Sequence, residues 1–303
     1  MKNKIILISG PTATGKSSLA IKIAEKINSE IINADSIQLY KDLSILTARP
    51  LLKSEKIKHH LYGFLSGDSK WSVGKWIEEV KSISESIIKK NKTPIIIGGT
   101  GFYFKAITDG LSPIPEIDPA IREELNDLAL TEGLENLYKK LQKSDPFAAD
   151  KINPNDKQRI IRALEVFIGT KIIISDYWKM KRELYIDTPT VNFSIEADRD
   201  WIYKRCDLRI DNMFREGVIE EVEGLMKKKY SNNTPIMKAI GVEEIISLLE
   251  EKITLREASD LIKFKTHQYA KRQITWINHQ MITWNKINTQ YSDKNIDKII
   301  KKL

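Results

Sequence analysis

The segment from residue 10 to residue 17 reads Gly-Pro-Thr-Ala-Thr-Gly-Lys-Ser, and it constrains the fold of this chain more than any other feature. It follows the apolar run of residues 5–8 and precedes a helical pattern that covers residues 18–24. A glycine-containing loop between a strand and a helix directs backbone N–H groups at phosphate oxygens, and the helix N-terminus adds partial positive charge. The sequence therefore predicts a P-loop that binds a diphosphate or a triphosphate.

All eight residues of this loop are candidate phosphate contacts. Lys16 brings a full positive charge and is a candidate catalytic residue, while the hydroxyl of Ser17 is a candidate ligand for Mg²⁺, the expected cofactor. The complete predicted diphosphate or nucleotide site consists of Gly10, Pro11, Thr12, Ala13, Thr14, Gly15, Lys16 and Ser17.

Four short apolar, β-branched runs predict buried parallel strands at residues 5–8, 31–34, 95–97 and 191–195. Helical patterns separate them, for example at residues 73–90. Strands that alternate with helices indicate an α/β fold with a doubly wound parallel sheet, here of the P-loop NTPase-like type.

Proline-containing breaks at residues 112–115 and 118–119 interrupt this alternation, and the pattern is then helical to about residue 185. Net charge changes over the same stretch, from +7 in residues 1–115 to −4 in residues 116–198 and +5 in residues 199–303. We therefore predict a core domain of residues 1–115 and 190–303, with C-terminal helices, and an inserted helical domain of residues 116–189.

The whole chain of 303 residues has a net charge of +8. Such an excess favours a polyanionic partner such as nucleic acid, although a lysine-rich solvated surface has the same signature. Cys206 is the single cysteine, which excludes an intramolecular disulfide and disfavours a thiolate metal site. No apolar run is long enough to span a bilayer, so we expect a cytoplasmic protein without a membrane partner.

Asp35 directly follows the second predicted strand. Ligands of open parallel sheets bind beyond the carboxyl ends of the strands, so this carboxylate is expected in the same crevice as the P-loop. There it can act as a general base or hold a metal-bound water. A turn or helix cap is the equally weighted alternative.

The third predicted strand ends in Gly98-Gly99-Thr100. The glycines permit a close backbone approach, and the threonine can hydrogen-bond a ligand. Nucleotide hydrolases often place an acidic metal-binding residue at such a strand end, and this strand has none. The pattern disfavours an ATPase or GTPase.

Three further segments carry basic groups. Asp198 is placed to cap a helix on which Arg205 and Arg209 share a face, either to grip a diphosphate or to pair on the surface with Asp207, Asp211 or Glu216. The helical run 158–162 offers arginines to a nucleic-acid backbone or to solvent. The run 269–276 mixes basic and aromatic residues, as RNA-binding surfaces do.

Taken in order along the chain, these motifs resemble the tRNA dimethylallyltransferase family in its bacterial form. The matching segments are residues 10–17, Asp-Ser-Ile-Gln-Leu-Tyr at 35–40, Thr-Ala-Arg-Pro at 47–50, His-His-Leu at 59–61, Gly-Gly-Thr-Gly-Phe-Tyr at 98–103, Gln-Arg-Ile-Ile-Arg-Ala-Leu-Glu-Val at 158–166, Ala-Ile-Gly at 239–241 and Ala-Lys-Arg-Gln-Ile-Thr-Trp at 270–276. Small departures occur at residues 46, 49 and 242–243.

The resemblance implies an enzyme that transfers a dimethylallyl group from dimethylallyl diphosphate to the exocyclic amine of an adenine. That adenine lies 3′-adjacent to the anticodon in tRNAs that read codons beginning with U. The implied partners are the tRNA anticodon loop and the prenyl donor, and the implied enzyme is a monomer that uses Mg²⁺.

The resemblance also assigns roles to individual residues. It implies that Asp35 is the general base and that Arg205, a second catalytic residue, holds the diphosphate. The implied tRNA contacts are Asp35, Ser36, Ile37, Gln38, Thr100, Arg122, Gln158, Arg159, Ile160, Ile161 and Arg162.

Three alternatives remain at this point. A P-loop small-molecule kinase shares the loop and the sheet, but it does not need the segments at 35–40 and 270–276. An isopentenyltransferase that acts on a free adenosine nucleotide shares the chemistry, but it does not need the long basic C-terminal portion. An RNA-binding protein with a vestigial P-loop does not need Lys16, Ser17 and Asp35 intact.

Overall fold

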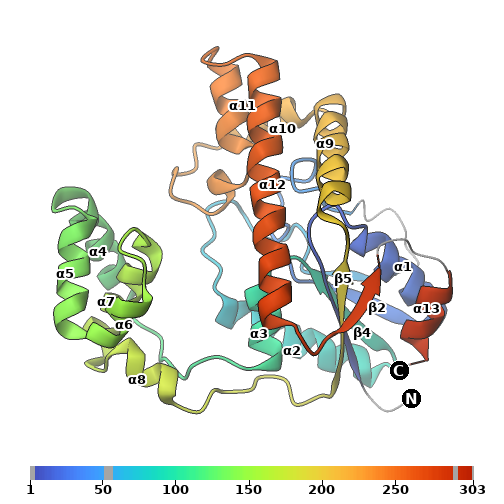
Figure 1. The fold of residues 1–303 in the computed structure, drawn as a ribbon, viewed down its shortest axis with the longest axis horizontal. Coiled ribbons are helices and arrows are strands. Elements are labelled where there is room, and N and C mark those ends of the chain that lie inside the picture. Colours follow the sequence, from blue (N-terminus) through green and yellow to red (C-terminus); the bar gives the residue numbers. More distant parts are fainter. Residues whose placement is uncertain (1–3, 51–56, 289–292, 302–303) are drawn as a thin grey trace. The chain divides into compact units, whose positions relative to one another are not determined.

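The computed structural model describes residues 4–50, 57–288 and 293–301, and its centre is a six-stranded sheet (Figure 1). The order is β3-β2-β4-β1-β5-β6, and every neighbouring pair is parallel. The strands are β1 (Ile5–Ser9), β2 (Ser29–Asn33), β3 (His59–His60), β4 (Thr93–Gly98), β5 (Thr190–Glu196) and β6 (Asn285–Asn288). The predicted parallel α/β sheet is confirmed.

The four predicted strands are the inner ones, and the two edge strands were missed. Strand β3 has only two residues, both histidine, and β6 reads Asn-Lys-Ile-Asn. Inner parallel strands are buried on both faces and therefore read as continuous apolar runs. Short polar edge strands carry no such signal.

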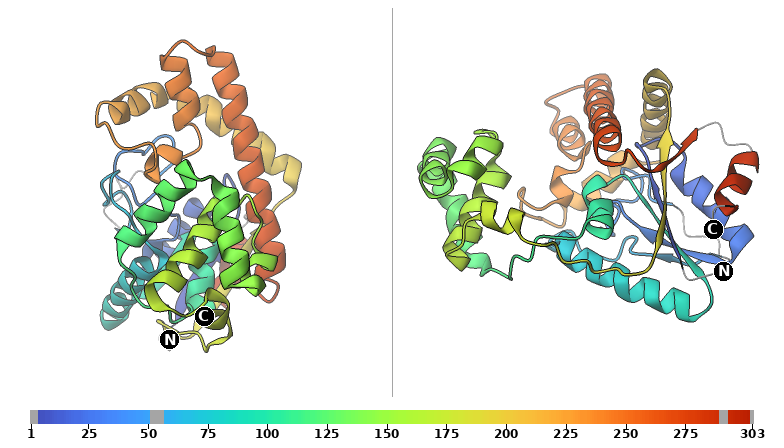
Figure 2. Two further views of the ribbon diagram at one scale, coloured as in Figure 1. Left: turned by 90° about the vertical axis from the view of Figure 1, so that its left-hand side faces the viewer. Right: turned by 60° about the horizontal axis from the view of Figure 1, so that its bottom comes forward.

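Helices cover both faces of the sheet (Figure 2). Helices α1 (Lys16–Ile27) and α13 (Asp293–Ile300) pack on one face, where Ile6 and Ile8 of β1 join their apolar cluster. Helices α2 (Val73–Lys89) and α3 (Gly101–Thr108) pack on the other. All five residues of β1 are buried as a result, and the loop that follows β1 has a rigid base.

Four more helices and a short 3₁₀ turn complete this part of the chain. They are α9 (Arg199–Arg215), α10 (Val218–Met226), η1 (Ile236–Lys238), α11 (Val242–Leu249) and α12 (Leu255–Gln280). The cap predicted at Asp198 is present, since its Oδ1 accepts the Trp201 N–H at 3.0 Å. Thr254 and Glu257 form a capping box at the start of α12. Among the described residues, no helix combines the length and apolarity needed to cross a membrane.

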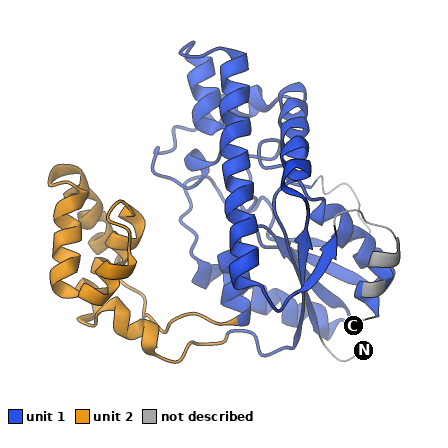
Figure 3. Ribbon diagram, viewed as in Figure 1, with its two compact units in different colours: residues 1–108, 185–303 blue, residues 109–184 orange. Residues whose placement is uncertain are grey.

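The chain divides into two compact units, residues 1–108 with 185–303, and residues 109–184 (Figure 3). We call them the core unit and the insert; the sequence placed the insert at 116–189. The insert consists of α4 (Pro119–Thr131), α5 (Leu134–Ser144), α6 (Pro146–Lys151), α7 (Lys157–Thr170) and α8 (Ile174–Lys179). It has its own apolar core, and its buried Asp145 accepts the N–H groups of Ala148 and Ser175 at 3.0 and 2.9 Å.

Candidate active site

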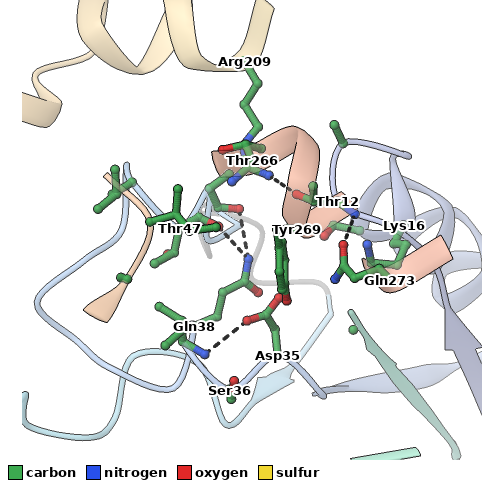
Figure 4. Close-up of a pocket in the computed structure, with 18 of the residues that line it drawn as sticks. Thr12, Lys16, Asp35, Ser36, Gln38, Thr47, Arg209, Thr266, Tyr269 and Gln273 are labelled. Atoms are coloured by element: carbon green, nitrogen blue, oxygen red, sulfur yellow. Dashed lines mark hydrogen bonds between the residues drawn. The ribbon is translucent and has the colours of Figure 1, made fainter. Parts of the chain in front are cut away.

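A cavity of about 540 Å³ opens at the carboxyl edge of the sheet (Figure 4). Strands β2, β4, β1 and β5 are neighbours in that order, so the segments after them meet there. Asp35 follows β2, Gly98 ends β4, the P-loop follows β1 and α9 follows β5. The topology thus brings together residues that are up to about 200 positions apart in the sequence.

The P-loop residues divide into those that line the cavity and those that support it. Gly15 takes a left-handed conformation (φ 79°) that glycine adopts without steric cost, and α1 begins at the next residue. Thr14, which is buried, donates its hydroxyl to the Pro11 carbonyl at 2.8 Å within the loop. The cavity-lining members of the predicted site are Thr12, Ala13, Gly15, Lys16 and Ser17, whereas Gly10, Pro11 and Thr14 are buried behind them.

Lys16 Nζ donates to the Pro11 carbonyl at 2.7 Å. Burial lowers the pKa of Lys16 to about 8, because the charged ammonium loses hydration, and the nearby Asp35 carboxylate acts in the opposite direction. An anionic ligand that replaced the carbonyl would stabilise the charged form and raise this pKa again.

Asp35 is both a turn cap and a cavity residue, so the two sequence interpretations do not exclude each other. Its Oδ1 accepts the Ile37 N–H at 3.1 Å, and its own N–H donates to Asn33 Oδ1 at 2.8 Å. The turn uses one carboxylate oxygen and fixes the direction of the side chain. Tyr269 of α12 points toward Asp35 (Figure 4), and burial together with that carboxylate raises the Tyr269 pKa.

The charges that line the cavity are strongly unbalanced. Within the described residues, Asp35 is the only acidic group among them. The cationic residues are Lys16, Arg205, Arg209, Lys238 and Arg272. Such a cavity attracts an anionic ligand and leaves one carboxylate available for proton transfer.

Both α9 arginines contact the P-loop. Arg205 Nε donates to the Ala13 carbonyl at 2.8 Å, and Arg209 Nη1 donates to the Thr12 hydroxyl at 2.7 Å. Arg209 Nε is buried without a hydrogen-bond partner in the described structure. Burial lowers the pKa of Arg209, which is the electrostatic cost of holding this charge beside the loop.

The predicted alternative, a surface pairing of these arginines with nearby acids, is wrong for two of the three acids named. Asp207 pairs with His267 at 2.7 Å, and Asp211 pairs with Lys263 at 2.6 Å. Both of these basic partners are on α12. The acids on α9 therefore attach it to α12, while its arginines remain directed at the P-loop.

Gln273 of α12 is a site residue that the sequence interpretation missed. Its Oε1 accepts the Thr12 N–H at 2.8 Å, and its Nε2 donates to the Gly99 carbonyl at 2.9 Å. The run 269–276 had been assigned to RNA from its composition alone. Tyr269 and Gln273 are four residues apart on a helix and therefore share a face, which is the signal that could have placed both at the site.

The residues after Asp35, which the resemblance assigns to tRNA, line the cavity and also bond within the protein. Ser36 donates its N–H to Thr100 Oγ1 at 3.0 Å, and Gln38 Nε2 donates to the Thr47 carbonyl at 2.9 Å. Ser36, Ile37 and Gln38 line the cavity, whereas Thr100 is not among its lining residues and holds the turn in place.

In the insert, two of the predicted tRNA contacts are engaged with an acid. Arg122 Nε lies 2.8 Å from Glu165 Oε2, and Arg162 Nη1 lies 3.1 Å from Glu165 Oε1. Only 7% of the Glu165 side chain is exposed. Gln158 and Arg159 are exposed, and Arg159 pairs with Asp156, which caps the helix.

Ile160 and Ile161 do not fit the tRNA role expected of them. They are 0% and 3% exposed and belong to the apolar core of the insert. The expectation that they contact tRNA is therefore wrong for their side chains. Helical periodicity turns this part of α7 inward, so that Gln158 and Arg159 are the exposed members of the run.

The donor groups at the P-loop fit Mg²⁺ that arrives with a phosphate. Mg²⁺ is held by oxygen atoms and keeps several waters, using one or two protein groups plus substrate phosphates. The Ser17 hydroxyl and the Asp35 carboxylate both line the cavity. No cluster of three or more His, Cys, Asp or Glu that could hold a metal by itself occurs in the described parts of the chain.

Sequence comparisons match the whole chain. The profile of the IPP transferase family matches residues 38–280, and that of isopentenyl transferase matches residues 3–63. The tRNA dimethylallyltransferase of Pelagibacter ubique is 44% identical over 301 residues, which cover 99% of this chain and 96% of that protein. The enzyme of the same name from Allorhizobium ampelinum is 40% identical and covers 93% of this chain and 94% of its own length.

Solved structures are similar over the same extent. A eukaryotic dimethylallyltransferase acting on tRNA superposes with a TM-score of 0.83 at 28% identity, covering 99% of this chain and 78% of that one. The tRNA isopentenylpyrophosphate transferase of Bacillus halodurans has a TM-score of 0.71 at 30% identity, covering 98% and 94%.

Proposed function

Because the chain belongs to the IPP transferase family, we propose that it transfers a dimethylallyl group from dimethylallyl diphosphate to the exocyclic amine of an adenine in tRNA. The observation that carries this proposal is the single carboxylate, Asp35, in a cavity lined by five cations. That charge pattern suits a reaction in which one proton is removed and a polyanion leaves.

The donor diphosphate occupies the P-loop. Backbone N–H groups of the loop, Lys16, Arg205 and Arg209 surround its oxygens. The Ser17 hydroxyl would hold a Mg²⁺ ion, which would supply further positive charge to the diphosphate. The two arginines already donate to P-loop oxygens at 2.8 and 2.7 Å, so small side-chain movements bring them onto a phosphate. Charge-assisted hydrogen bonds of this kind stabilise the negative charge that grows on the leaving group.

Asp35 accepts the proton of the acceptor amine. The amine nitrogen forms a bond to the terminal allylic carbon while that carbon–oxygen bond breaks, and the electron pair leaves with the diphosphate. The amine proton passes to the Asp35 carboxylate, whose direction is set by the turn at Ile37. The adenine must leave its base stack for this, because its amine is otherwise out of reach.

The acceptor base is the adenine 3′-adjacent to the anticodon in tRNAs that read codons beginning with U. Ser36, Ile37 and Gln38 line the cavity next to Asp35 and contact this base. The exposed Gln158 and Arg159 of the insert contact the RNA backbone. Thr100 bonds Ser36 in the core unit, and Arg122 and Arg162 bond Glu165 in the insert. These three residues therefore support the tRNA contacts by positioning neighbouring groups.

The protein works as a monomer in the cytoplasm, where tRNA is modified.

One incubation tests the proposed reaction. Dimethylallyl diphosphate labelled in the prenyl group is supplied with Mg²⁺ and with tRNA, AMP or no acceptor. We expect the label in tRNA alone, at the adenine 3′ to the anticodon. Label in AMP would support the nucleotide-acceptor alternative, and transfer of a labelled γ-phosphate from ATP to a small molecule would support the kinase alternative. Either result would replace this proposal.

A further inference from the structure

The carboxylate of Glu221, on α10, collects four hydrogen bonds from three consecutive residues of a distant segment. The donors and their distances are Ser44 N–H at 2.6 Å, Ser44 Oγ at 2.8 Å, Ile45 N–H at 2.8 Å and Leu46 N–H at 2.9 Å. The first three reach Oε1 and the last reaches Oε2, so both oxygens are used. This cluster lies outside the residues assigned above to phosphate, proton or base.

Consecutive backbone N–H groups that converge on an anion form a strong and directional site. Hydrogen bonds to a charged acceptor are roughly twice as strong as neutral ones. The half-buried Glu221 thus fixes the backbone of residues 44–46 from a position about 175 residues later in the chain.

The segment is held from its other side by groups near Asp35. Gln38 Nε2 donates to the carbonyls of Thr47 and Ala48 at 2.9 and 3.4 Å. Arg49 Nη1 donates to the Tyr40 carbonyl at 2.9 Å. Residues 44–49 are therefore clamped between α10 and the segment that follows β2.

This clamped segment forms a wall of the cavity, because Leu46, Thr47 and Ala48 line it. Leu46 is 6% exposed and packs against Gly241, where a Cβ atom would lie 2.6 Å from Leu46 Cδ1 and 3.6 Å from Ile262 Cδ1. Leu46 and Ile262 therefore both approach Gly241, and a side chain at Gly241 would displace the wall.

The other apolar cavity residues extend this lining. Ile210 and Met213 lie three apart on α9, beyond the arginines that face the P-loop, and Ile240 precedes Gly241. Lys16, Arg205 and Arg209 thus place positive charge at the P-loop, and Leu46 contributes to the apolar part of the cavity lining. A hydrocarbon chain attached to a bound diphosphate can pack against this apolar lining.

We propose that Glu221 is a positioning residue that sets the size of the prenyl subsite by holding the wall of residues 46–48 in place. The inference rests on the proposed function, since it assumes a prenyl diphosphate in the cavity. Glu221 touches no reacting atom and acts through Leu46. Its consequence is selectivity for a five-carbon donor over a ten-carbon one.

The test replaces Glu221 with glutamine and measures donor selectivity. Glutamine keeps the shape but has a single acceptor oxygen, and its NH₂ group faces backbone N–H donors. The matched control is Glu220→Gln, which makes the same charge change in the same first turn of α10 at an exposed residue. The probes are the unreactive thiolodiphosphate analogues of dimethylallyl and geranyl diphosphate, and the readout is the ratio of their equilibrium dissociation constants.

We expect the preference of the wild-type protein for the dimethylallyl analogue to fall by about tenfold in Glu221→Gln, in the range that hydrophobic pockets distinguish by size. Glu220→Gln should keep the wild-type ratio. Ser44→Ala removes one of the four donors and should give an intermediate ratio, which keeps the test available if Glu221→Gln does not fold.

The outcomes separate this inference from the proposed function. A wild-type protein that binds neither analogue contradicts the proposed function itself. A wild-type preference that Glu221→Gln and Ser44→Ala retain, even with a lower melting temperature, overturns the inference alone and leaves Glu221 as a stabilising residue.

Discussion

The sequence predicts that arginines of the core unit hold a diphosphate and that arginines of the insert contact tRNA, and the structure gives the two sets different partners. In the core unit, Arg205 and Arg209 donate to uncharged oxygens of the P-loop. In the insert, Arg122 and Arg162 share the carboxylate of Glu165. The side chains are the same, but only the insert pair bonds a carboxylate, which offsets one of its two positive charges.

The difference explains where positive charge is available to a ligand. A guanidinium that bonds a neutral oxygen retains its charge, and a phosphate can replace that oxygen with a gain in energy. A guanidinium that compensates a buried carboxylate cannot leave it without exposing an uncompensated charge. The core unit therefore offers reactive charge, whereas Arg122 of α4 bonds Glu165 of α7, and Arg162 bonds the same carboxylate within α7.

The largest effect is expected at the one acid of the core cavity. Asp35→Ala should lower turnover by about 10²–10⁴-fold, because the amine proton then has no positioned acceptor. Binding of the dimethylallyl analogue should change far less. Single-turnover assays with saturating tRNA measure the first quantity, and unchanged turnover would remove Asp35 from the role of base.

The second effect compares the two sets of arginines directly. Arg209→Ala should weaken binding of the dimethylallyl analogue by about 10–100-fold, as expected for loss of a hydrogen bond to a charged group. Arg162→Ala in the insert, the matched control, should leave this affinity unchanged and lower the melting temperature instead. Equal losses in both variants would contradict the contrast between the units.

The third effect concerns pH and follows from the Lys16 pKa, which burial lowers to about 8. Below this value Lys16 is already charged, so donor affinity should be constant. Above it, binding must take up a proton, and affinity should fall by about tenfold per pH unit. Lys16→Arg should bind with a flat profile from pH 7 to 9; a falling profile in that variant would show that another group titrates.

The smallest effect is expected at the surface of the insert. Arg159→Ala removes an exposed cation and should reduce the slope of log tRNA affinity against log salt concentration by about 1. Donor binding should be unaffected. Titrations of tRNA at several salt concentrations test this, and an unchanged slope would exclude a phosphate contact by Arg159.

Much of the fold was readable because inner strands and helix caps are local features. The runs at 5–8 and 95–97 are apolar throughout, since both faces of the sheet are covered, and Asp198 and Thr254 act on their own helices. The edge strands β3 and β6 could not be predicted, because a strand that pairs on one side only does not need an apolar sequence. The resemblance assigns the whole run 158–162 to tRNA, but helical periodicity turns the Ile161 side chain into the apolar core of the insert.

The amino-acid sequence alone is enough to predict a phosphate-binding loop, the strand before it and the helix after it, and a carboxylate at the same edge of the sheet. These depend on contacts between near neighbours, whose geometry the backbone dictates. Which side chains complete the cavity depends on packing across long separations. Gln273 bonds to Thr12, Glu221 bonds the backbone at Leu46, and Glu165 bonds Arg162. Only folding decides which acids each cation can reach, and therefore which charges remain for the substrate.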